Sequence, residues 1–539
     1  MIQKKKSANH FVRQAAILAA ASLMVRLIGF IYRLPLTVLI EDTGNALYNA
    51  AYYIYAFAIT ITSGALPAAI SKLVSERIAL GKYGDAHELF KTAMMGAAIL
   101  GGVVALFMFL SAGWLTQLRF FNYPGAVYAV RVLAPTLFFV ALLAVFRGYF
   151  QGMNTMIPTA ISQVVEQLFN AAFSLWLAHV FFRGLRVEHA AAGAAAGTGI
   201  GVVVGLIVVI GFYMLVARNI RVRAVGSNHT QFLNGGAENR KFQIRALVQT
   251  ALPIIIGMGI YQIATIIDLG MAGDRIMASG YFTEDEIVVM VGQFTGKFLL
   301  LTTLPVSLSV ALNQAVIPDI SSSNATLDRV AVKHKINTAL RISMTLSIPA
   351  VVGLSVLADP ILRLLFPTQP DGGWLLRYGS ISIIFLALVQ VSSGALQGIG
   401  KVMLPVTAAL GGVLIKIPVN WILLAIPQIN ILATVISTIV CYVVAATINM
   451  VFLYKQTGVK PDYIGAFIKP AFAAFGMGLF CFITHHIVGL IAPDRVATIF
   501  SLCLGVPVYL LLMWMIGGFP NHDNDSTPIP KILRKWFKS

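Results

Sequence analysis

The sequence predicts an all-α polytopic membrane protein in which about 14 transmembrane helices form two pseudo-symmetric six-helix lobes, followed by two C-terminal helices. Three observations predict this fold class. Hydrophobic residues make up 58% of the chain and charged residues 11%, whereas soluble domains carry about 25% charged residues. The apolar residues are gathered into segments long enough to cross a bilayer. The two halves of the chain also carry matching motifs, which indicates a duplicated unit.

A membrane-spanning helix needs about 20 mainly apolar residues. Such segments lie near 11–39, 46–73, 92–116, 126–150, 157–182, 190–216, 243–271, 287–317, 337–357, 374–396, 404–426, 429–454, 467–489 and 497–518. The first and eighth segments are longer than one span and contain Pro35 and Pro305. We expect kinks or interfacial extensions there.

Lys and Arg residues lie mainly in alternate connections between these segments. With the N-terminus inside, the inner loops and tails hold about 27 of the 39 basic residues and the outer loops hold about six. This asymmetry predicts that both termini are cytoplasmic. It also explains the net charge of +18 without a nucleic-acid partner, so the expected surroundings are membrane lipids.

One motif occurs in both halves of the chain. Gly148-Tyr-Phe-Gln-Gly152, followed by Pro158, matches Gly394-Ala-Leu-Gln-Gly398, followed by Pro405, about 246 residues later. Internal repeats in a membrane protein predict a transporter whose site lies between the repeated halves. Because two lobes in one chain complete such a unit, we expect a monomer.

The longest polar inner stretch separates the two halves and sets the predicted domain boundaries. Each half then has six helices, and two helices remain. The predicted domains are an N-terminal lobe of helices 1–6 (1–216), a cytoplasmic inter-lobe loop (217–242), a C-terminal lobe of helices 7–12 (243–454), and helices 13 and 14 with a basic cytoplasmic tail (455–539).

Several cations fall inside apolar segments, where a charge costs a few kcal/mol. Arg26 and Arg33 are seven residues apart, so they share one face of the first helix, about 10 Å apart along its axis. Two guanidinium groups on one face suit a pyrophosphate, because each can hold two oxygens. The alternative for Arg33 is that it reaches the outer interface beside Pro35. The surplus of buried cations predicts a cavity for an anionic ligand.

The buried acids are fewer. Lys416 lies in the eleventh helix and Glu166 in the fifth, which is its equivalent in the repeat. We expect these two side chains to pair across the cavity; the alternative is an ion pair with a purely structural role. Asp268 either joins this charge network or ends its helix, and Asn420 is expected to hydrogen-bond between helices.

Lys297 has two possible positions. It is deep in the membrane if the eighth helix begins near residue 287, and interfacial if that helix begins near 297.

Little in the chain suggests an enzyme. It has no Walker-type glycine loop, no HExxH motif and no GxSxG motif in a strand–turn–helix context. No catalytic residue and no cofactor are expected. The three cysteines, Cys441, Cys481 and Cys503, lie in apolar segments without metal-ligand spacing, so no metal site is expected either.

Three stretches resemble a known family. Phe146-Arg-Gly-Tyr-Phe-Gln-Gly152, with Pro158-Thr-Ala-Ile-Ser-Gln-Val-Val-Glu-Gln167, resembles a signature of bacterial polysaccharide-transport proteins. These are the stage V sporulation protein B-like and MurJ-like lipid II flippases of the MOP superfamily. Arg26-Leu-Ile-Gly-Phe-Ile-Tyr-Arg33 and Lys416-Ile-Pro-Val-Asn420 are similar to the first and eleventh helices of that branch.

The resemblance implies a two-lobe flippase of the bacterial cell membrane. By alternating access it would move an undecaprenyl-pyrophosphate-linked cell-wall precursor from the inner to the outer leaflet. Arg26, Arg33 and Lys297 would bind the pyrophosphate, and helices 13 and 14 would border a groove for the lipid tail. Two departures from the family pattern are the seven-residue spacing of the arginines, often six in the family, and a lysine at position 297 in place of arginine.

Other functions remain open on this sequence. A flippase for another polyprenyl-linked saccharide would need the same charges. A multidrug or cation antiporter of the same superfamily should have an excess of buried carboxylates, and a membrane glycosyltransferase should have a larger outer domain than the short loop 272–286.

Some relatives are expected to bind sodium between helices 7, 11 and 12. In this chain Lys416 brings a fixed cation to helix 11. Our hypothesis is that the lysine takes the charge role of that sodium.

Overall fold

The structure is a computed structural model. It describes residues 2–118, 123–153, 155–184, 186–232, 239–303, 305–306, 320, 323–324, 328–401 and 403–518. These residues form helices and no strand.

The first half of the chain contains nine named α-helices and three shorter helical segments. In order they are α1 (Ile2–Ile59), the π-helical η1 (Thr60–Gly64), α2 (Leu66–Ala79), α3 (Tyr83–Leu110), α4 (Ala112–Thr116), η2 (Pro124–Ala126), α5 (Val127–Leu133), α6 (Thr136–Gly152), α7 (Ile157–Gly184), α8 (Val187–Phe232) and α9 (Arg240–Met277). The third short segment, the π-helical η3 (Gln293–Phe298), comes later, directly after α10 of the second half. Both α8 and α9 reach into the expected loop 217–242, so much of its backbone is helical.

The second half begins with α10 (Glu284–Gly292). It continues with α12 (Arg329–Val356), α13 (Ala358–Leu365), α14 (Gly373–Gly379), α15 (Ser382–Gly398), α16 (Met403–Leu424), α17 (Leu432–Thr457), the π-helical η4 (Ile464–Ile468), α18 (Lys469–Gly489) and α19 (Asp494–Met515). Pro349, Pro418 and Pro507 lie inside α12, α16 and α19.

Among the described residues, ten helices are long and apolar enough to cross a membrane, or up to twelve if each of two bent pairs is one span. The described residues of each predicted segment are mainly helical, although most of the eighth segment after Thr303 lies outside the described residues. The predicted fold class is confirmed. The count differs from fourteen in part because the first two predicted helices lie in one 59-residue segment, Ala20–Ile78. That segment turns sharply at Glu41, which has φ 58° and ψ −179°.

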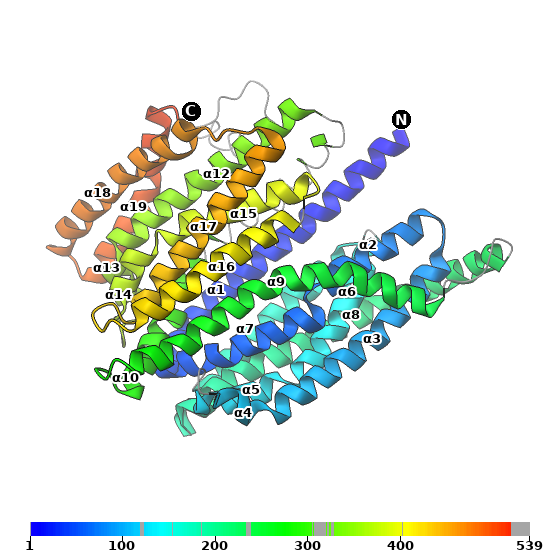
Figure 1. The fold of residues 1–539 in the computed structure, drawn as a ribbon, viewed down its shortest axis with the longest axis horizontal. Helices are drawn as coiled ribbons and strands as arrows, with labels where there is room; N and C mark the ends of the chain where they lie inside the picture. Colours follow the sequence, from blue (N-terminus) through cyan, green and yellow to red (C-terminus); the bar gives the residue numbers. More distant parts are fainter. Residues whose placement is uncertain are drawn as a thin grey trace.

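The helices form two bundles (Figure 1). We call α1–α8 the N-terminal bundle and α9–α17 the C-terminal bundle; α18 and α19 lie at the edge of the latter, against α12 and α13. The long helix α9 runs along the boundary. Its first half packs on α2 and α3, where Gln243 accepts a 2.8 Å hydrogen bond from Thr92. Its second half packs on α16 through Ile260 and Ala264.

Glycines set how closely the helices approach one another. A Cβ on Gly201 of α8 would lie 2.5 Å from the carbonyl oxygen of Glu166, and one on Gly197 would lie 2.3 Å from the backbone nitrogen of Ser174. Small residues are the usual means of close helix packing in membranes, where no hydrophobic force drives helices together. Here they bring α7 and α8 together along most of their length.

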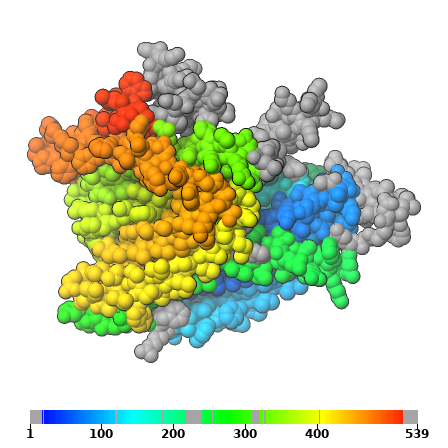
Figure 2. All heavy atoms as spheres, turned by 45° about the horizontal axis from the view of Figure 1, so that its top comes forward, coloured from blue at the N-terminus to red at the C-terminus, as the bar shows by residue number. Residues whose placement is uncertain are grey.

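The two bundles also meet directly near the kink of α1. A Cβ on Gly292, at the end of α10, would lie 1.9 Å from the carbonyl oxygen of Asp42, and one on Gly296 of η3 would lie 2.9 Å from Asn45. The kink therefore fits tightly against the first part of the C-terminal bundle. In the space-filling view the yellow-to-orange atoms of the C-terminal bundle and the blue and cyan atoms of the N-terminal bundle form one continuous mass (Figure 2).

Candidate functional site

A cavity of about 550 Å³ lies between the two bundles. Its walls come from α1, α7 and α8 on one side and from α9, η3 and the helical residues 299–303 on the other. Among the described residues that line it, two are charged, and both are arginines: Arg26 and Arg33. The neutral polar lining residues other than tyrosine are Gln167, Asn170, Thr198, Thr265, Thr295 and Thr303. The cavity is therefore positively charged and rich in hydrogen-bonding groups.

Arg26 and Arg33 reach the cavity from the same face of α1, as their spacing predicts. Both are partly exposed. Between them lies Gly29, whose added Cβ would be 3.1 Å from the amide nitrogen of Gln167 in α7. The glycine thus lets the polar Gln167 side chain approach α1 next to the arginines.

Arg33 is held by aromatic rings. Its guanidinium carbon lies 5.1 Å from the ring centre of Tyr52 and 5.6 Å from that of Tyr48, and the two rings are stacked on each other. Cation–π contacts of this kind gain strength where water is excluded. The guanidinium of Arg33 therefore lies against these two rings at the cavity wall.

The sequence analysis missed these tyrosines, although they carry a signal. Tyr48, Tyr52 and Tyr55 are spaced four and three residues apart, which places them on one face of a helix. Nothing local shows that this face turns back onto Arg33, because the turn depends on the kink at Glu41.

Lys297 is buried inside the protein, but it does not line the cavity. Its ammonium donates 2.8 Å to the Oδ2 atom of Asp42, 2.7 Å to the carbonyl oxygen of Gln369 and 3.1 Å to that of Asp371. The side chains of Lys297 and Asp42 are 3% and 4% exposed. All three N–H donors of the lysine are therefore in use, and the ion pair joins the two bundles.

Asp42 binds the C-terminal bundle a second time. Its backbone N–H donates 2.9 Å to the Oε1 atom of Gln369, in the connection between α13 and α14. Sequence reasoning overlooked Asp42 because it lies between two apolar segments, where an acid is normally a solvated loop residue. Its partner Lys297 is 255 residues away.

Lys416 and Glu166 do not pair, so that expectation is wrong. Lys416 of α16 donates to the Oδ2 atom of Asp268 in α9, whose other oxygen accepts 3.2 Å from the amide of Asn420. Glu166 instead accepts 2.6 Å from Arg147 in α6. Both charges are thus paired within their own bundle, so neither is left buried and uncompensated.

The positions of Asp268 and Asn420 settle two open alternatives. Asp268 is buried, nine residues before the last residue of α9, so it does not end its helix. Asn420 makes the interhelical hydrogen bond expected of it. Within the described part of the chain, no group of three or more His, Cys, Asp or Glu residues could hold a metal ion.

Comparison with known proteins identifies the family. Residues 11–324 match the family described as polysaccharide biosynthesis protein, and residues 253–422 match the MatE family. The chain belongs to the polysaccharide biosynthesis protein family.

Two similar proteins come from Bacillus subtilis (strain 168). The lipid II flippase MurJ is 26% identical over 469 residues, which is 84% of each chain. Stage V sporulation protein B is 25% identical over 480 residues, covering 87% of this chain and 88% of the relative. The resemblance seen in the sequence motifs is confirmed.

Solved structures show the same fold. An inward-facing multidrug resistance MATE transporter of the MOP superfamily superposes with a TM-score of 0.65 at 14% identity, covering 82% of this chain and 98% of that one. The lipid II flippase MurJ in an inward closed conformation gives 0.63 at 15% identity, covering 91% and 98%. The chain therefore shares the fold of these proteins, and its ten long apolar helices among the described residues fit a multi-pass membrane protein.

Proposed function

We propose that the protein is a flippase that moves an undecaprenyl-pyrophosphate-linked cell-wall precursor, similar to lipid II, from the inner to the outer leaflet by alternating access. The main support is the cavity between the bundles, in which the charged lining residues are Arg26 and Arg33. The names of the two Bacillus subtilis relatives fit this proposal, since one is a lipid II flippase and the other a sporulation protein.

Phosphate chemistry explains why two arginines suit this cavity. A guanidinium group offers paired N–H donors that match phosphate oxygens, and each such charged hydrogen bond is stronger than a neutral one. Arg26 and Arg33 are about 10 Å apart along the helix axis. We therefore assign the pyrophosphate to Arg26 first, with Arg33, fixed over Tyr48 and Tyr52, as the next contact along α1.

Lys297 has a different role in this proposal. In the present arrangement Asp42 and two carbonyl oxygens occupy its ammonium. When the bundles separate around the kink of α1, that contact must break and the ammonium becomes available to phosphate. The closed and separated states would thus differ in the number of cations available to the cargo. This difference favours movement of the cargo from one end of the cavity to the other.

The charge of the cavity also separates this proposal from its main competitor. An antiporter of cationic drugs needs buried carboxylates, but Asp42, Glu166 and Asp268 are each paired with a cation and none lines the cavity. A flippase for another polyprenyl-linked saccharide has the same charge requirement, so only a cargo comparison distinguishes it.

Transport by purified protein in liposomes tests the proposal. The probes are fluorescent lipid II, a polyprenyl-pyrophosphate disaccharide and a cationic dye, each followed by accessibility to an added quencher. We expect transport of lipid II, and Arg26→Ala should lower its rate about tenfold or more, because a charge-assisted hydrogen bond contributes about 1.5–3 kcal/mol.

The matched control is Arg131→Ala, which removes an exposed arginine of α5 that does not line the cavity. It should transport normally. Undiminished lipid II transport by Arg26→Ala, or transport of the dye alone, would disprove the proposal; faster transport of the disaccharide would reassign the cargo within the same mechanism.

We further propose that the protein acts as a monomer with both termini in the cytoplasm. The positive charge of alternate loops supports this orientation. In a cysteine-free background, a membrane-impermeant thiol reagent added to intact cells should label Glu284→Cys, at the start of α10, and spare Lys82→Cys, before α3. The reverse pattern would invert the topology.

A further inference from the structure

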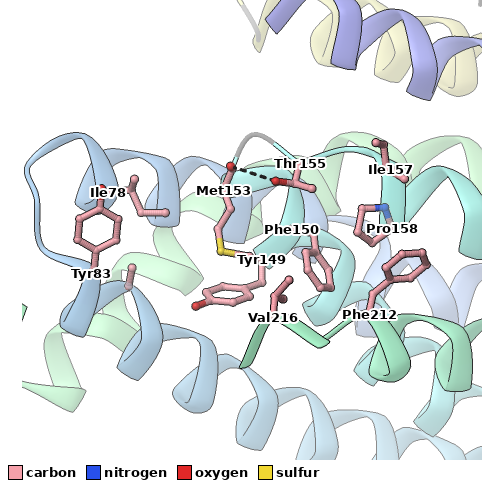
Figure 3. A pocket seen from close by; sticks show the side chains of 11 residues that line it. Ile78, Tyr83, Tyr149, Phe150, Met153, Thr155, Ile157, Pro158, Phe212 and Val216 are labelled. Atoms are coloured by element: carbon pink, nitrogen blue, oxygen red, sulfur yellow. Dashed lines mark hydrogen bonds between the residues drawn. The ribbon is translucent and has the colours of Figure 1, made fainter. Parts of the chain in front are cut away.

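A second cavity, of about 500 Å³, lies inside the N-terminal bundle and apart from the first. It is formed where α2 and α6 end and where α3 and α7 begin, with α8 closing one side (Figure 3). None of its lining residues lines the cavity between the bundles. Its walls are apolar apart from one threonine and the hydroxyl groups of two tyrosines, Tyr83 and Tyr149.

The repeated motif of the sequence builds this pocket. A Cβ on Gly148 would lie 3.0 Å from the backbone of Pro67, and one on Gly152 would lie 2.7 Å from Val74, so these glycines bring α6 against α2. Tyr149 and Phe150, between the glycines, then form part of the wall (Figure 3). No residue of the motif lines the cavity between the bundles; the motif instead packs α6 on α2 and lines the second pocket.

The pocket is open at its rim. Tyr83, Ile157 and Val216 line it and are 37%, 41% and 36% exposed, and they come from three different helices. Leu80, in the adjoining turn, is 72% exposed. An apolar space of this size holds water poorly, because it offers few hydrogen-bond partners. At the ends of membrane helices the available apolar ligand is a lipid chain.

The turn beside the pocket carries positive charge. The backbone N–H of Lys82 donates 2.9 Å to the carbonyl oxygen of Arg77, and this turn places Lys82 directly before the lining residue Tyr83. Arg77 itself is buried and donates 2.9 Å to the carbonyl oxygen of Leu73. Lys82 is exposed. Under the orientation proposed above, this turn meets the cytoplasmic leaflet, whose negative surface potential comes from anionic lipids.

The acidic residues near this turn are Glu76, Asp85 and Glu88. Glu88 is paired with Lys91 at 2.8 Å, and Asp85 is buried. Glu76 remains, against the exposed Lys72 and Lys82.

We propose that this pocket binds one acyl chain of an anionic phospholipid of the inner leaflet, with the phosphate of the headgroup held by Lys82. The hydrocarbon chain enters between Tyr83 and Ile157 and contacts Phe150. The site is independent of the cargo, since it shares no residue with the cavity between the bundles.

Photo-crosslinking tests this site. The full-length protein is reconstituted with phosphatidylglycerol that carries a diazirine on one acyl chain, and the labelled peptides are mapped by mass spectrometry. We expect labelling of the segment 149–158. Ile157→Trp, which fills the pocket from its rim, should lower that labelling about tenfold, because several methylene groups lose their apolar contacts.

The matched control is Leu106→Trp, at a residue of α3 that is 60% exposed and does not line the pocket. It should label as the parent protein does. Thermal unfolding of each variant shows whether it is folded. Lys82→Ala should lower labelling by phosphatidylglycerol and leave labelling by the matching phosphatidylcholine probe unchanged.

Three results would overturn the proposal. One is the absence of label in 149–158 of the parent protein. Another is equal labelling by phosphatidylglycerol and phosphatidylcholine that is unaffected by Lys82→Ala. The third is stronger labelling by a photoreactive polyprenyl phosphate than by the phospholipid, which would assign the pocket to the carrier chain of the cargo.

Discussion

Lys297 of η3 donates a 2.8 Å hydrogen bond to Asp42 of α1, and both side chains are almost completely buried. The two residues belong to different bundles, so the contact exists only while the bundles are closed at this end. An ion pair in this position is costly to break one partner at a time, because the remaining charge stays buried. It therefore acts as a latch in the proposed transport cycle.

Removing one partner of this latch should favour the separated state. Asp42→Asn leaves the Lys297 ammonium without its counter-charge, and we expect the closed state to lose about 3–5 kcal/mol. Spin labels at the exposed Thr43 and Tyr281 report the separation of the bundles, which should increase. The control is Arg363→Ala, which breaks a half-exposed pair with Asp494 and should change little. An unchanged distance distribution in Asp42→Asn would show that the pair is no latch.

We expect the aromatic faces of the rings that hold Arg33, and not their hydroxyl groups, to contribute to cargo binding. Tyr52→Phe keeps the ring below the guanidinium, whereas Tyr52→Ala removes it. We expect Tyr52→Ala to weaken cargo binding by about 0.5–2 kcal/mol, or roughly 2- to 30-fold, and Tyr52→Phe to bind as the parent does. Equilibrium binding of lipid II to the protein in nanodiscs measures both. Equal losses in the two variants would assign the effect to the hydroxyl.

The partners of Lys416 and Glu166 predict which substitutions interact. In a double-mutant cycle on thermal stability, Lys416→Met and Asp268→Asn should be strongly non-additive, because each single change leaves a buried charge unpaired. Lys416→Met and Glu166→Gln should instead add within about 0.5 kcal/mol, since Lys416 pairs with Asp268 and Glu166 with Arg147. A large coupling in the second cycle would mean that the two bundles exchange partners during the transport cycle.

The ammonium of Lys416 also predicts the ion requirement of transport. It already places a cation against the Asp268 carboxylate, where a monovalent metal ion would otherwise be attracted. We expect transport in liposomes at clamped membrane potential to proceed equally well in sodium, potassium or choline buffers. A requirement for sodium in the parent protein would refute this role for the lysine.

Local sequence determined most of the secondary structure and part of the site. The apolar runs are helical wherever the structure describes them for most of their length, because a chain surrounded by lipid must satisfy its own backbone hydrogen bonds. The shared face of Arg26 and Arg33 followed from the helical repeat alone. The sequence likewise showed that the glycines belong to a repeated motif, but it did not show that they bring α6 close to α2.

Only the tertiary structure decided which charges are available to a ligand. Lys297 was expected beside the arginines, but it pairs with Asp42, 255 residues away. Lys416 was expected to pair with Glu166, but α9 places Asp268 next to it. The tyrosines reach Arg33 only because α1 turns back at Glu41. Pairing of buried charges depends on distances between helices that are remote in sequence. The Coulomb attraction between two charges is strong in a medium of low polarity, so the nearest opposite charge in space determines the partner.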